Sequence, residues 1–326
     1  MSLVEKIVEM RDLTIRFQSK HASLARQSFV QAVSDVNLSV LKGETLALVG
    51  ESGSGKTTLV RSILGLVKVT KGSILFRGHS LSEMSKAQQH DMRRRVQFIF
   101  QDPFSSLNPR LTVRDIIQEP LLVHRIGNSA SRIDRVDLIM RQVGLSPDAA
   151  KRYPHQFSGG QRQRIAIARA LASEPELIIA DEPLSALDVS IQSQILNLLS
   201  DLKIETGVSY LLVSHDLNAV HHLADRIAVM YLGRIVELSS KKVLFDAPRH
   251  PYTAALIQAM PKVGVSKRIP GRALHGEIPS PINPPSGCAF HPRCLRATAV
   301  CKQEIPRMQF SDEMNGVACH HPLGEL

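Results

Sequence analysis

An apolar segment runs directly into a glycine-rich loop at Leu46-Ala47-Leu48-Val49-Gly50-Glu51-Ser52-Gly53-Ser54-Gly55-Lys56-Thr57-Thr58. The loop fits the pattern G-x-x-x-x-G-K-[ST], it follows a segment of strand type, and helix-compatible residues come after it. Its glycines allow backbone N–H groups to turn inward around phosphate oxygens, and the N-terminus of the following helix adds its dipole. We therefore predict a nucleotide site here, which this context favours over a structural glycine-rich turn.

Two side chains of the loop are predicted to interact with the phosphate charge and with Mg²⁺. Lys56 is placed to neutralise the β and γ phosphates, and the hydroxyl of Thr57 is placed to bind Mg²⁺. The predicted nucleotide-binding residues of the loop are Gly50, Ser52, Gly53, Ser54, Gly55, Lys56, Thr57 and Thr58.

A second apolar segment, residues 177–180, ends in two adjacent carboxylates, Asp181 and Glu182. If the strand geometry continues, these side chains point in opposite directions and take different roles. We predict that Asp181 holds Mg²⁺, directly or through water. Glu182 is predicted to polarise the attacking water, because in-line phosphoryl transfer chiefly needs positioning and charge stabilisation.

Composition describes an ordinary globular chain. Its 326 residues suffice for one large or two medium domains, and 43% are hydrophobic and 21% charged. No stretch approaches the ~18 apolar residues that span a bilayer, and the start lacks the pattern of a secretory signal. We therefore expect a cytosolic protein. The net charge of +10 favours acidic partners without choosing one, and short runs such as Arg93-Arg94-Arg95 indicate a solvated face.

The pattern of segments predicts an α/β fold. Residues 1–100 are rich in strand-type segments, including 45–49, 73–76 and 96–100, with one helix after Lys56. Residues 103–157 have helical spacing, with helices expected at 113–123 and 135–143. From residue 158 on, helices at 161–173 and 191–205 alternate with strands at 177–180 and 210–213, which predicts a parallel sheet with helices on its faces.

The composition changes near residue 246. The last 66 residues hold nine of the 18 prolines, and all four cysteines lie between Cys288 and Cys319. A proline-rich stretch this poor in long apolar runs buries little core of its own. We therefore expect this stretch to be stabilised by something other than a hydrophobic core of its own.

A further glycine-rich turn distinguishes this chain from other P-loop ATPases. Phe157-Ser158-Gly159-Gly160-Gln161, followed by the helical residues 162–171, resembles the signature segment of the ABC ATPase family. Such a turn at a helix N-terminus is a second anion-binding device without a nucleotide of its own, which suggests that a second chain supplies the phosphate. The resemblance assigns Ser158, Gly159, Gly160 and Gln161 to nucleotide binding.

The remaining family pattern follows in order over nearly all of the first 245 residues. Gln101 resembles the glutamine that senses Mg²⁺ and the attacking water, and His215 resembles the switch histidine that contacts the γ-phosphate. The segment Ser185-Ala186-Leu187-Asp188 resembles the loop that crosses the dimer interface, and Asp188 is its candidate nucleotide-binding residue. For the aromatic ring that stacks on adenine, both Phe17 and Phe29 are available, with Phe17 preferred; a core role stays open for either.

Several segments are similar to the dipeptide/oligopeptide importer branch of the family, whose relatives also carry nickel and glutathione. They are residues 102–109, residues 154–164, the tail Arg249-His250-Pro251-Tyr252-Thr253, residues 276–281 and the cysteine-containing end. The resemblance implies an ABC ATPase domain at residues 1–245, with an antiparallel β subdomain and a helical subdomain at about 103–157. Residues 246–326 then form the C-terminal extension of the branch.

The four cysteines, Cys288, Cys294, Cys301 and Cys319, allow three alternatives: a 4Fe-4S cluster, a tetrahedral Zn²⁺ site, or free or disulfide-bonded thiols. Their spacing is not the paired pattern of zinc ribbons. The importer branch is linked to a C-terminal iron-sulfur cluster, so the resemblance favours 4Fe-4S.

The resemblance as a whole implies an ATPase that binds Mg-ATP between two such domains, with Glu182, His215 and Gln101 as catalytic residues and Thr57, Gln101 and Asp181 at the Mg²⁺. The implied partners are a second ATPase chain, identical or different, two membrane-spanning permease subunits and an extracytoplasmic solute-binding protein. The implied location is the cytoplasmic face of the inner membrane, as a peripheral protein. Two other classes stay open: a nucleic-acid- or ribosome-associated ABC ATPase, and a regulatory subunit that binds ATP without turnover.

Overall fold

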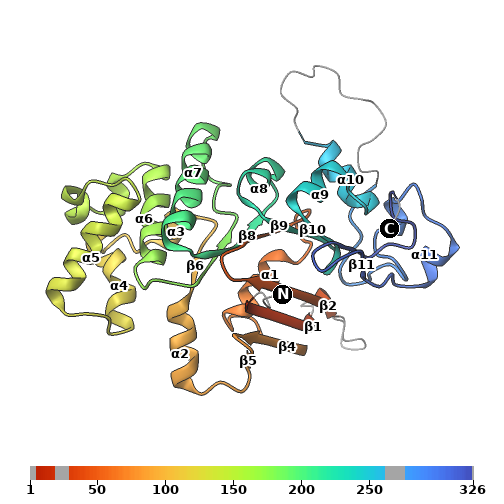
Figure 1. Cartoon of the computed structure of the whole chain (residues 1–326), viewed down its shortest axis with the longest axis horizontal. Coiled ribbons are helices and arrows are strands. Elements are labelled where there is room, and N and C mark those ends of the chain that lie inside the picture. The colour runs from red at the N-terminus through yellow and green to blue at the C-terminus, as the bar shows by residue number, and fades with distance from the viewer. Residues whose placement is uncertain (1–4, 19–28, 261–275, 325–326) are drawn as a thin grey trace. The chain divides into compact units, whose positions relative to one another are not determined.

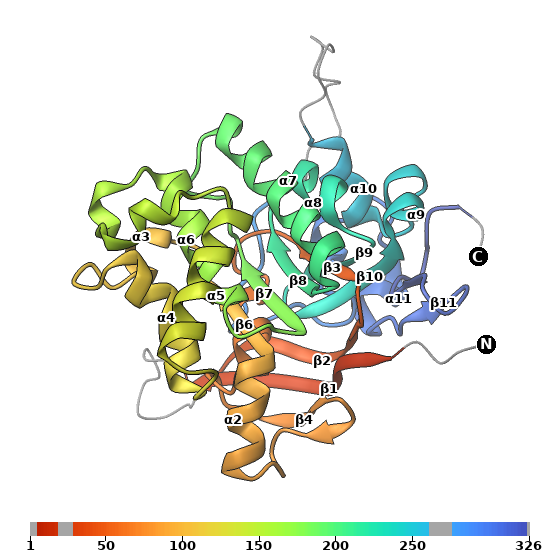
Figure 2. The same cartoon turned by 60° about the vertical axis from the view of Figure 1, so that its left-hand side comes forward.

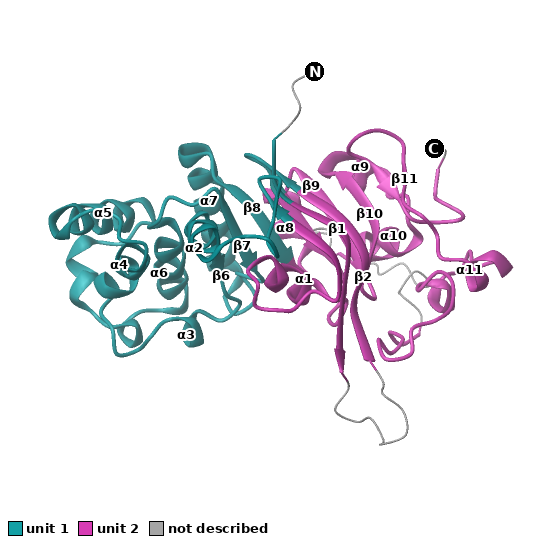
Figure 3. Ribbon diagram, turned by 90° about the horizontal axis from the view of Figure 1, so that it is seen from below, with its two compact units in different colours: residues 1–8, 40–45, 75–213 teal, residues 9–39, 46–74, 214–326 magenta. Residues whose placement is uncertain are grey.

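A computed structural model describes residues 5–18, 29–260 and 276–324 of the chain and forms two compact units (Figure 3). Unit 1 consists of residues 1–8, 40–45 and 75–213. Unit 2 consists of residues 9–39, 46–74 and 214–326. The first four residues of the chain, which belong to the segment without a secretory pattern, lie outside the described ranges.

Parallel strands form the sheet of unit 1, in the order β8 (Ser209–Ser214), β7 (Leu177–Asp181) and β6 (Val96–Ile99). Every residue of β7 and β8 is buried. Strands covered on both faces need nearly continuous apolar runs, which is what residues 177–180 provide. The sheet therefore confirms the parallel arrangement predicted from alternating strands and helices, and it places Asp181 at the carboxyl end of β7.

The helical part of unit 1 is built around α4 (Val113–Val123), α5 (Ser129–Gln142) and α6 (Gly159–Leu171), and α4 packs against both others (Figures 1 and 2). Buried aliphatic residues, such as Ile117 of α4 and Ile139 of α5, lie at helical spacing. The other elements of unit 1 are β5 (His79–Ser80), α2 (Lys86–Arg95), α3 (Pro103–Ser106), the 3-10 turns η1 (Pro147–Lys151) and η2 (Pro154–Gln156), and α7 (Val189–Thr206).

Two further groups of strands have most of their residues in unit 2. One has the order β11 (Gln309–Phe310), β12 (Gly316–Val317), β10 (Arg234–Ser240), β9 (Arg226–Tyr231) and β3 (Thr45–Val49). In this group β3 and β9 are parallel, and the other neighbouring pairs are antiparallel. The other group has the order β2 (Phe29–Leu41), β1 (Lys6–Gln18) and β4 (Lys71–Phe76), visible together in Figure 2.

The helices of unit 2 follow the strand ends that matter for the site. They are α1 (Lys56–Ile63), α8 (Leu217–Leu223), α9 (Lys241–Asp246), α10 (Pro251–Gln258), the 3-10 turn η3 (His291–Arg293) and α11 (Ala299–Gln303). Thus α1 follows β3, and α8 follows β8, with His215 in the short connection between them.

Most predicted elements are confirmed, with boundaries shifted by a few residues. The helix expected at 135–143 begins earlier, at Ser129, because Asn128 caps it in a reciprocal pair with Ser131. The expectation of a single helix in the first 100 residues is wrong, because α2 also lies there. Met92 is the only buried residue of α2, so the segment lacks the apolar periodicity that reveals a helix.

The run of arginines at the end of α2 is only partly a solvated face. Arg93 is exposed, but Arg95 contacts both Asp91 and Glu176. The contact with Glu176 joins α2 to the residue before β7 within unit 1, while the contact with Asp91 lies within α2.

The C-terminal residues 276–324 attach to unit 2 through the sheet. Strand β12 pairs with β10, and Val317 is fully buried. The ring of Phe290 packs on Tyr231 and Tyr252, with centroids 5.3 and 5.4 Å apart. A segment too poor in apolar residues for its own core is thus anchored by strand pairing and aromatic contacts with the rest of unit 2, which the sequence did not reveal.

None of the helices in the described ranges combines the length and apolar composition that crossing a membrane requires.

Candidate functional site

The loop between β3 and α1 has a backbone that requires glycine. Gly50 has φ +150°, and a Cβ there would lie 2.1 Å from the carbonyl oxygen of Met230. Gly55 has φ +104°, and its Cβ would lie 2.1 Å from the carbonyl oxygen of Ala32. Any side chain at either position would collide with backbone. The loop is therefore pressed against β9 and β2 of unit 2, which fixes its path.

The loop ends at the N-terminus of α1 in a form suited to an anion. The N-cap residue is Gly55, which offers no capping side chain, and the first turn carries no acidic residue. Lys56 is buried, and its Nζ donates hydrogen bonds to the carbonyl oxygens of Gly50 at 2.7 Å and Glu51 at 3.0 Å. The buried Oγ of Ser54 has no hydrogen-bond partner among the described residues. This unsatisfied hydroxyl, the glycines and the lysine fit a bound phosphate.

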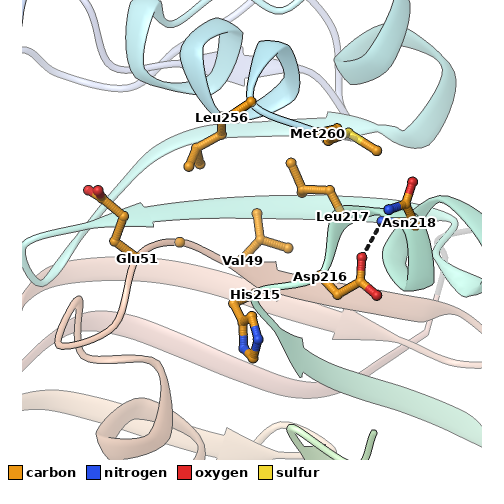
Figure 4. A pocket seen from close by; sticks show the side chains of 10 residues that line it. Val49, Glu51, His215, Asp216, Leu217, Asn218, Leu256 and Met260 are labelled. Atoms are coloured by element: carbon orange, nitrogen blue, oxygen red, sulfur yellow. Dashed lines mark hydrogen bonds between the residues drawn. The ribbon is translucent and has the colours of Figure 1, made fainter. Parts of the chain in front are cut away.

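His215 and the phosphate loop line one cavity of about 240 Å³ in unit 2. His215 lies between β8 and α8, while Gly50 and Glu51 come from the loop (Figure 4). Leu256 and Met260 form another side of the cavity, across from His215 (Figure 4). The structure therefore brings the predicted switch histidine together with the start of the phosphate loop, although they are more than 160 residues apart in sequence.

In unit 1, the predicted catalytic groups Gln101 and Glu182 are in direct contact. Nε2 of Gln101 donates a hydrogen bond to Oε2 of Glu182 at 3.0 Å. The backbone N–H of Glu182 donates to the carbonyl of Val213 at 2.9 Å. Asp181, the preceding residue, ends β7 and is 1% exposed, whereas Glu182 is half-buried. The two adjacent carboxylates thus differ in burial, as their different predicted roles require.

The glycine-rich turn at residues 158–161 forms the N-terminus of α6. The Oγ of Ser158 accepts from the backbone N–H of Gln161 at 3.3 Å, and Oε1 of Gln161 accepts from the N–H of Ser158 at 3.1 Å. A Cβ on Gly160 would lie 2.5 Å from a side-chain carbon of Ile191. Glycine is therefore needed here for helix packing as well as for access to an anion, and the side chains of Ser158 and Gln161 remain exposed.

Asp188 is the exposed N-cap residue of α7, and its carboxylate makes no capping hydrogen bond. It lies in unit 1, as do residues 158–161. Leu187, its neighbour in sequence, lies beside Gly159, since a Cβ on that glycine would be 3.6 Å from Cδ2 of Leu187. The two segments predicted to face a second chain are therefore adjacent in one unit.

The two candidate adenine-stacking residues are both exposed, Phe17 by 42% and Phe29 by 43%. Neither ring is buried in the core, so the core alternative is not what the structure shows for either. Exposure does not distinguish the two, and Phe17 stays the prediction.

Comparisons with known proteins identify the family of this chain. The family described as "ABC transporter" matches residues 33–185, and the one described as "Oligopeptide/dipeptide transporter, C-terminal region" matches residues 236–301. The oligopeptide transport ATP-binding protein AppF of Bacillus subtilis (strain 168) is 49% identical over 97% of this chain and 97% of its own length. The chain belongs to the ABC transporter family.

Other similar proteins agree with this membership. The probable peptide ABC transporter ATP-binding protein y4tS of Sinorhizobium fredii is 52% identical over 89% of this chain and 82% of its own length. Among solved structures, the ATP-binding cassette MJ0796, as a dimer in a post-hydrolysis state bound to ADP and Pi, is 30% identical with a TM-score of 0.64. It covers 72% of this chain and 98% of its own. The chain is an ATPase of this family, and the family implies binding of ATP and Mg²⁺.

In this ABC ATPase, the four cysteines of the C-terminal region all line one small cavity of unit 2, together with histidines such as His291 and His321. All four are free thiols, so no disulfide joins them. Burial raises the pKa of Cys288, Cys294 and Cys319, the last to about 11. As placed, no three Cys, His, Asp or Glu side chains among the described residues form a group that could hold a metal ion.

Sequence reasoning missed a set of contacts between the phosphate loop and the C-terminal region. The carboxylate of Glu51 pairs with the guanidinium of Arg293, and the N–H of Glu51 donates to the hydroxyl of Tyr252. Glu51 occupies a variable position of the loop pattern, and its partners are more than 200 residues away in sequence. Nothing in the spacing could have paired them.

Proposed function

We propose that this chain is the ATP-hydrolysing subunit of an ABC importer that takes up dipeptides or oligopeptides. The single observation that carries the ATPase part is the cavity shared by the phosphate loop and His215. The peptide part is supported by the match of residues 236–301 to the oligopeptide/dipeptide C-terminal region, and by relatives named for oligopeptide and peptide transport. We further propose residues 1–245 as the ATPase domain, with a helical subdomain at about 103–157, and residues 246–326 as the extension.

In the proposed nucleotide site, Lys56 neutralises phosphate charge, and the backbone and side chains of residues 50–58 surround the phosphates. Thr57, Gln101 and Asp181 are the proposed Mg²⁺ ligands, directly or through water. When bound, the ion would supply positive charge that neutralises the charge developing on the phosphates. Phe17 is the proposed stacking partner of adenine.

Hydrolysis is proposed to depend on three side chains. Glu182 orients the attacking water and accepts its proton as a general base. Gln101 holds the Glu182 carboxylate by the hydrogen bond described above. His215 contacts the γ-phosphate at the edge of the loop. Once the γ-phosphate leaves, the charge that these groups share is removed, which favours opening of the site.

One proposed partner, a second ATPase chain, follows from groups that have no nucleotide of their own, and the other partners follow from the similarity to peptide importers. Ser158, Gly159, Gly160, Gln161 and Asp188 would contact the nucleotide bound by a second ATPase chain, identical or different. The complex would also contain two membrane-spanning permease subunits and an extracytoplasmic solute-binding protein. The chain would then lie at the cytoplasmic face of the inner membrane as a peripheral subunit.

The test of this function is peptide uptake by the assembled transporter in vesicles that enclose ATP. Uptake of a labelled dipeptide or oligopeptide should require ATP and stop when Glu182→Gln replaces the wild-type chain. Uptake that is ATP-dependent for another solute but absent for peptides would reject the peptide assignment. ATPase activity that responds to nucleic acid or ribosomes, and to no transported solute, would favour the non-transport class instead.

We also propose that Cys288, Cys294, Cys301 and Cys319 ligate a 4Fe-4S cluster. Support comes from the lining of one cavity by all four thiols, the number of ligands that such a cluster needs. Binding would require small shifts of the side chains and loss of the thiol protons, because no metal-holding group is present as the residues are placed.

Anaerobic purification tests this cluster assignment. We expect brown protein with iron and sulfide near four per chain, as the cluster formula requires, and loss of both in Cys288→Ser. Ser286→Ala, a nearby change that leaves all thiols intact, should keep the cluster. Colourless protein without iron would reject the cluster, and one zinc per chain would replace it with the zinc alternative.

A further inference from the structure

Glu51, the second residue of the phosphate loop, is held at three of its groups. Its backbone N–H donates to Oη of Tyr252 at 2.9 Å, and its carbonyl accepts from Nζ of Lys56 at 3.0 Å. Its two carboxylate oxygens accept from Nη1 and Nη2 of Arg293 at 2.7 and 3.1 Å. The carboxylate points away from His215 (Figure 4). Residue 51 is therefore fixed in position and in orientation.

Arg293 is well placed to hold this geometry. Its side chain is only 4% exposed, and its two-pronged contact with a carboxylate fixes both distance and angle. The hydrogen bond with Glu51 raises the pKa of Arg293 above its ordinary value. A further hydrogen bond joins Nη1 to the hydroxyl of Tyr231 at 3.4 Å. The guanidinium therefore keeps its charge and has little freedom to turn.

Tyr252 belongs to a packed aromatic cluster. Tyr231, Tyr252 and Phe290 are each at most 3% exposed, and the centroids of the two tyrosine rings are 4.7 Å apart. Closely packed rings leave the phenol few alternative orientations. The hydroxyl that accepts from Glu51 is thus presented by a rigid support made of α10, β9 and the C-terminal region.

The position of Glu51 matters for the lysine of the loop. Nζ of Lys56 is bound by the carbonyl oxygens of Gly50 and Glu51, so a shift of residue 51 moves the groups that hold the ammonium. Because the Lys56 ammonium is proposed to neutralise phosphate charge, such a shift weakens the binding of the nucleotide.

We propose that Arg293 and Tyr252 are positioning residues of the nucleotide site, through which the C-terminal region sets the affinity of the loop for Mg-ATP. This inference rests on the proposed function in one respect, namely that residues 50–58 bind the phosphates. It adds that the C-terminal region belongs to the nucleotide site itself, because it supplies the counterion and the hydrogen-bond acceptor that fix residue 51.

Equilibrium binding of a fluorescent ATP analogue with Mg²⁺ to the full chain tests the proposal, with thermal unfolding measured in parallel. Arg293→Ala should weaken binding about tenfold, equivalent to 1.4 kcal/mol. Tyr252→Phe keeps the ring and should weaken binding about threefold, the loss of one hydrogen bond acceptor. Glu51→Gln combined with Arg293→Ala should bind no more weakly than Arg293→Ala alone, because both changes break one interaction.

Controls separate positioning from general stability. Arg307→Ala, at an exposed arginine of the same region, should bind like the wild type. Arg293→Lys keeps the charge without the two-pronged geometry and should restore part of the affinity. In the assembled transporter, Arg293→Ala should raise KM for ATP about tenfold while kcat changes less than about twofold, since lost ground-state binding appears in KM.

Three results have distinct meanings. If Lys56→Ala binds the analogue as the wild type does, the proposed site is wrong whatever the other variants do. If Lys56→Ala loses binding while Tyr252→Phe and Arg293→Lys keep wild-type affinity, the positioning role is refuted, even where Arg293→Ala fails to fold. Lower thermal stability with unchanged affinity would likewise assign Arg293 a structural role only.

Discussion

Glu182 adopts a backbone φ of +48°, a conformation that non-glycine residues rarely take. Such a conformation stores about 1 to 3 kcal/mol and persists only when neighbouring contacts hold it. Here the N–H of Glu182 bonds to Val213 and its carboxylate to Gln101. Strain held in this way is common at catalytic residues, which agrees with the role proposed for this carboxylate.

Glu182→Gln should lower phosphate release by the assembled transporter by a factor of about 10² to 10⁴ while keeping Mg-ATP bound, since the amide cannot take up a proton. Phosphate release and nucleotide binding are the two measurements. Glu174→Gln is the matched control, because Glu174 is an exposed residue of unit 1 that also has a positive φ, +54°. A wild-type rate in Glu182→Gln would exclude it as the residue that activates water.

Gly50 and Gly53 allow steric collision to be separated from backbone strain. Both have positive φ, but a Cβ on Gly50 meets the Met230 carbonyl at 2.1 Å, whereas a Cβ on Gly53 meets nothing within 4 Å. We expect Gly53→Ala to cost about 1 kcal/mol of unfolding free energy. Gly50→Ala should cost clearly more and abolish nucleotide binding, measured by urea unfolding and by titration with Mg-ATP. Equal effects would mean that the collision is relieved by loop movement.

At the scale of elements, α10 has an unusual N-cap. His250 is 1% exposed, and its Nδ1 accepts from the backbone N–H of Tyr252 at 3.0 Å. An imidazole that accepts at Nδ1 must be neutral, and burial lowers the pKa of His250 to about 3. The carboxylate of Glu237 supports the same helix start by accepting from the N–H groups of Arg249 and His250.

The depressed pKa of His250 predicts a pH dependence of stability. Below its unfolded pKa of about 6.5, the unfolded chain binds a proton that the folded chain excludes, so the unfolding free energy falls as pH drops from about 6.5 towards 3. His250→Asn keeps an N-cap acceptor and removes the titrating ring. The unfolding free energy of this variant, measured with urea at several pH values, should fall less steeply with decreasing pH than that of the wild type. Both proteins contain Glu237, so its titration does not account for the difference. Parallel curves would contradict the buried neutral histidine.

At the scale of the whole molecule, exposed groups of unit 1 are proposed to complete the site of a second chain. Ser158, Gln161 and Asp188 are exposed, although each stands at or next to a helix N-terminus that suits an anion. The proposal therefore predicts association that depends on nucleotide.

Glu182→Gln should dimerise in the presence of Mg-ATP, because it retains the γ-phosphate. If the second ATPase chain of the complex is a different protein, that chain is added to the sample. Adding Ser158→Arg should prevent this association, which light scattering after size exclusion measures. Adding Ser129→Arg, the same change in the exposed first turn of α5, should not. Association that survives Ser158→Arg would remove residues 158–161 from the interface.

Sequence patterns alone predict the phosphate loop, the carboxylate pair at the end of β7 and the alternating strands and helices. These are local features, because spacing along one segment decides whether glycines, a lysine and an apolar strand occur together. Such patterns failed at α2, where ion pairs and a cap replace an apolar face, and at the C-terminal region, whose core is supplied by another part of the chain.

Which distant residues meet is visible only in the folded chain. The fold pairs Gln101 with Glu182, brings His215 to the phosphate loop, and joins Glu51 to Arg293 and Tyr252. These contacts depend on the order of strands in each sheet and on where a helix or strand ends, since strand ends distant in sequence meet at one edge. No periodicity of a single segment carries that information, and so the part of the nucleotide site built from the C-terminal region became visible only in the folded chain.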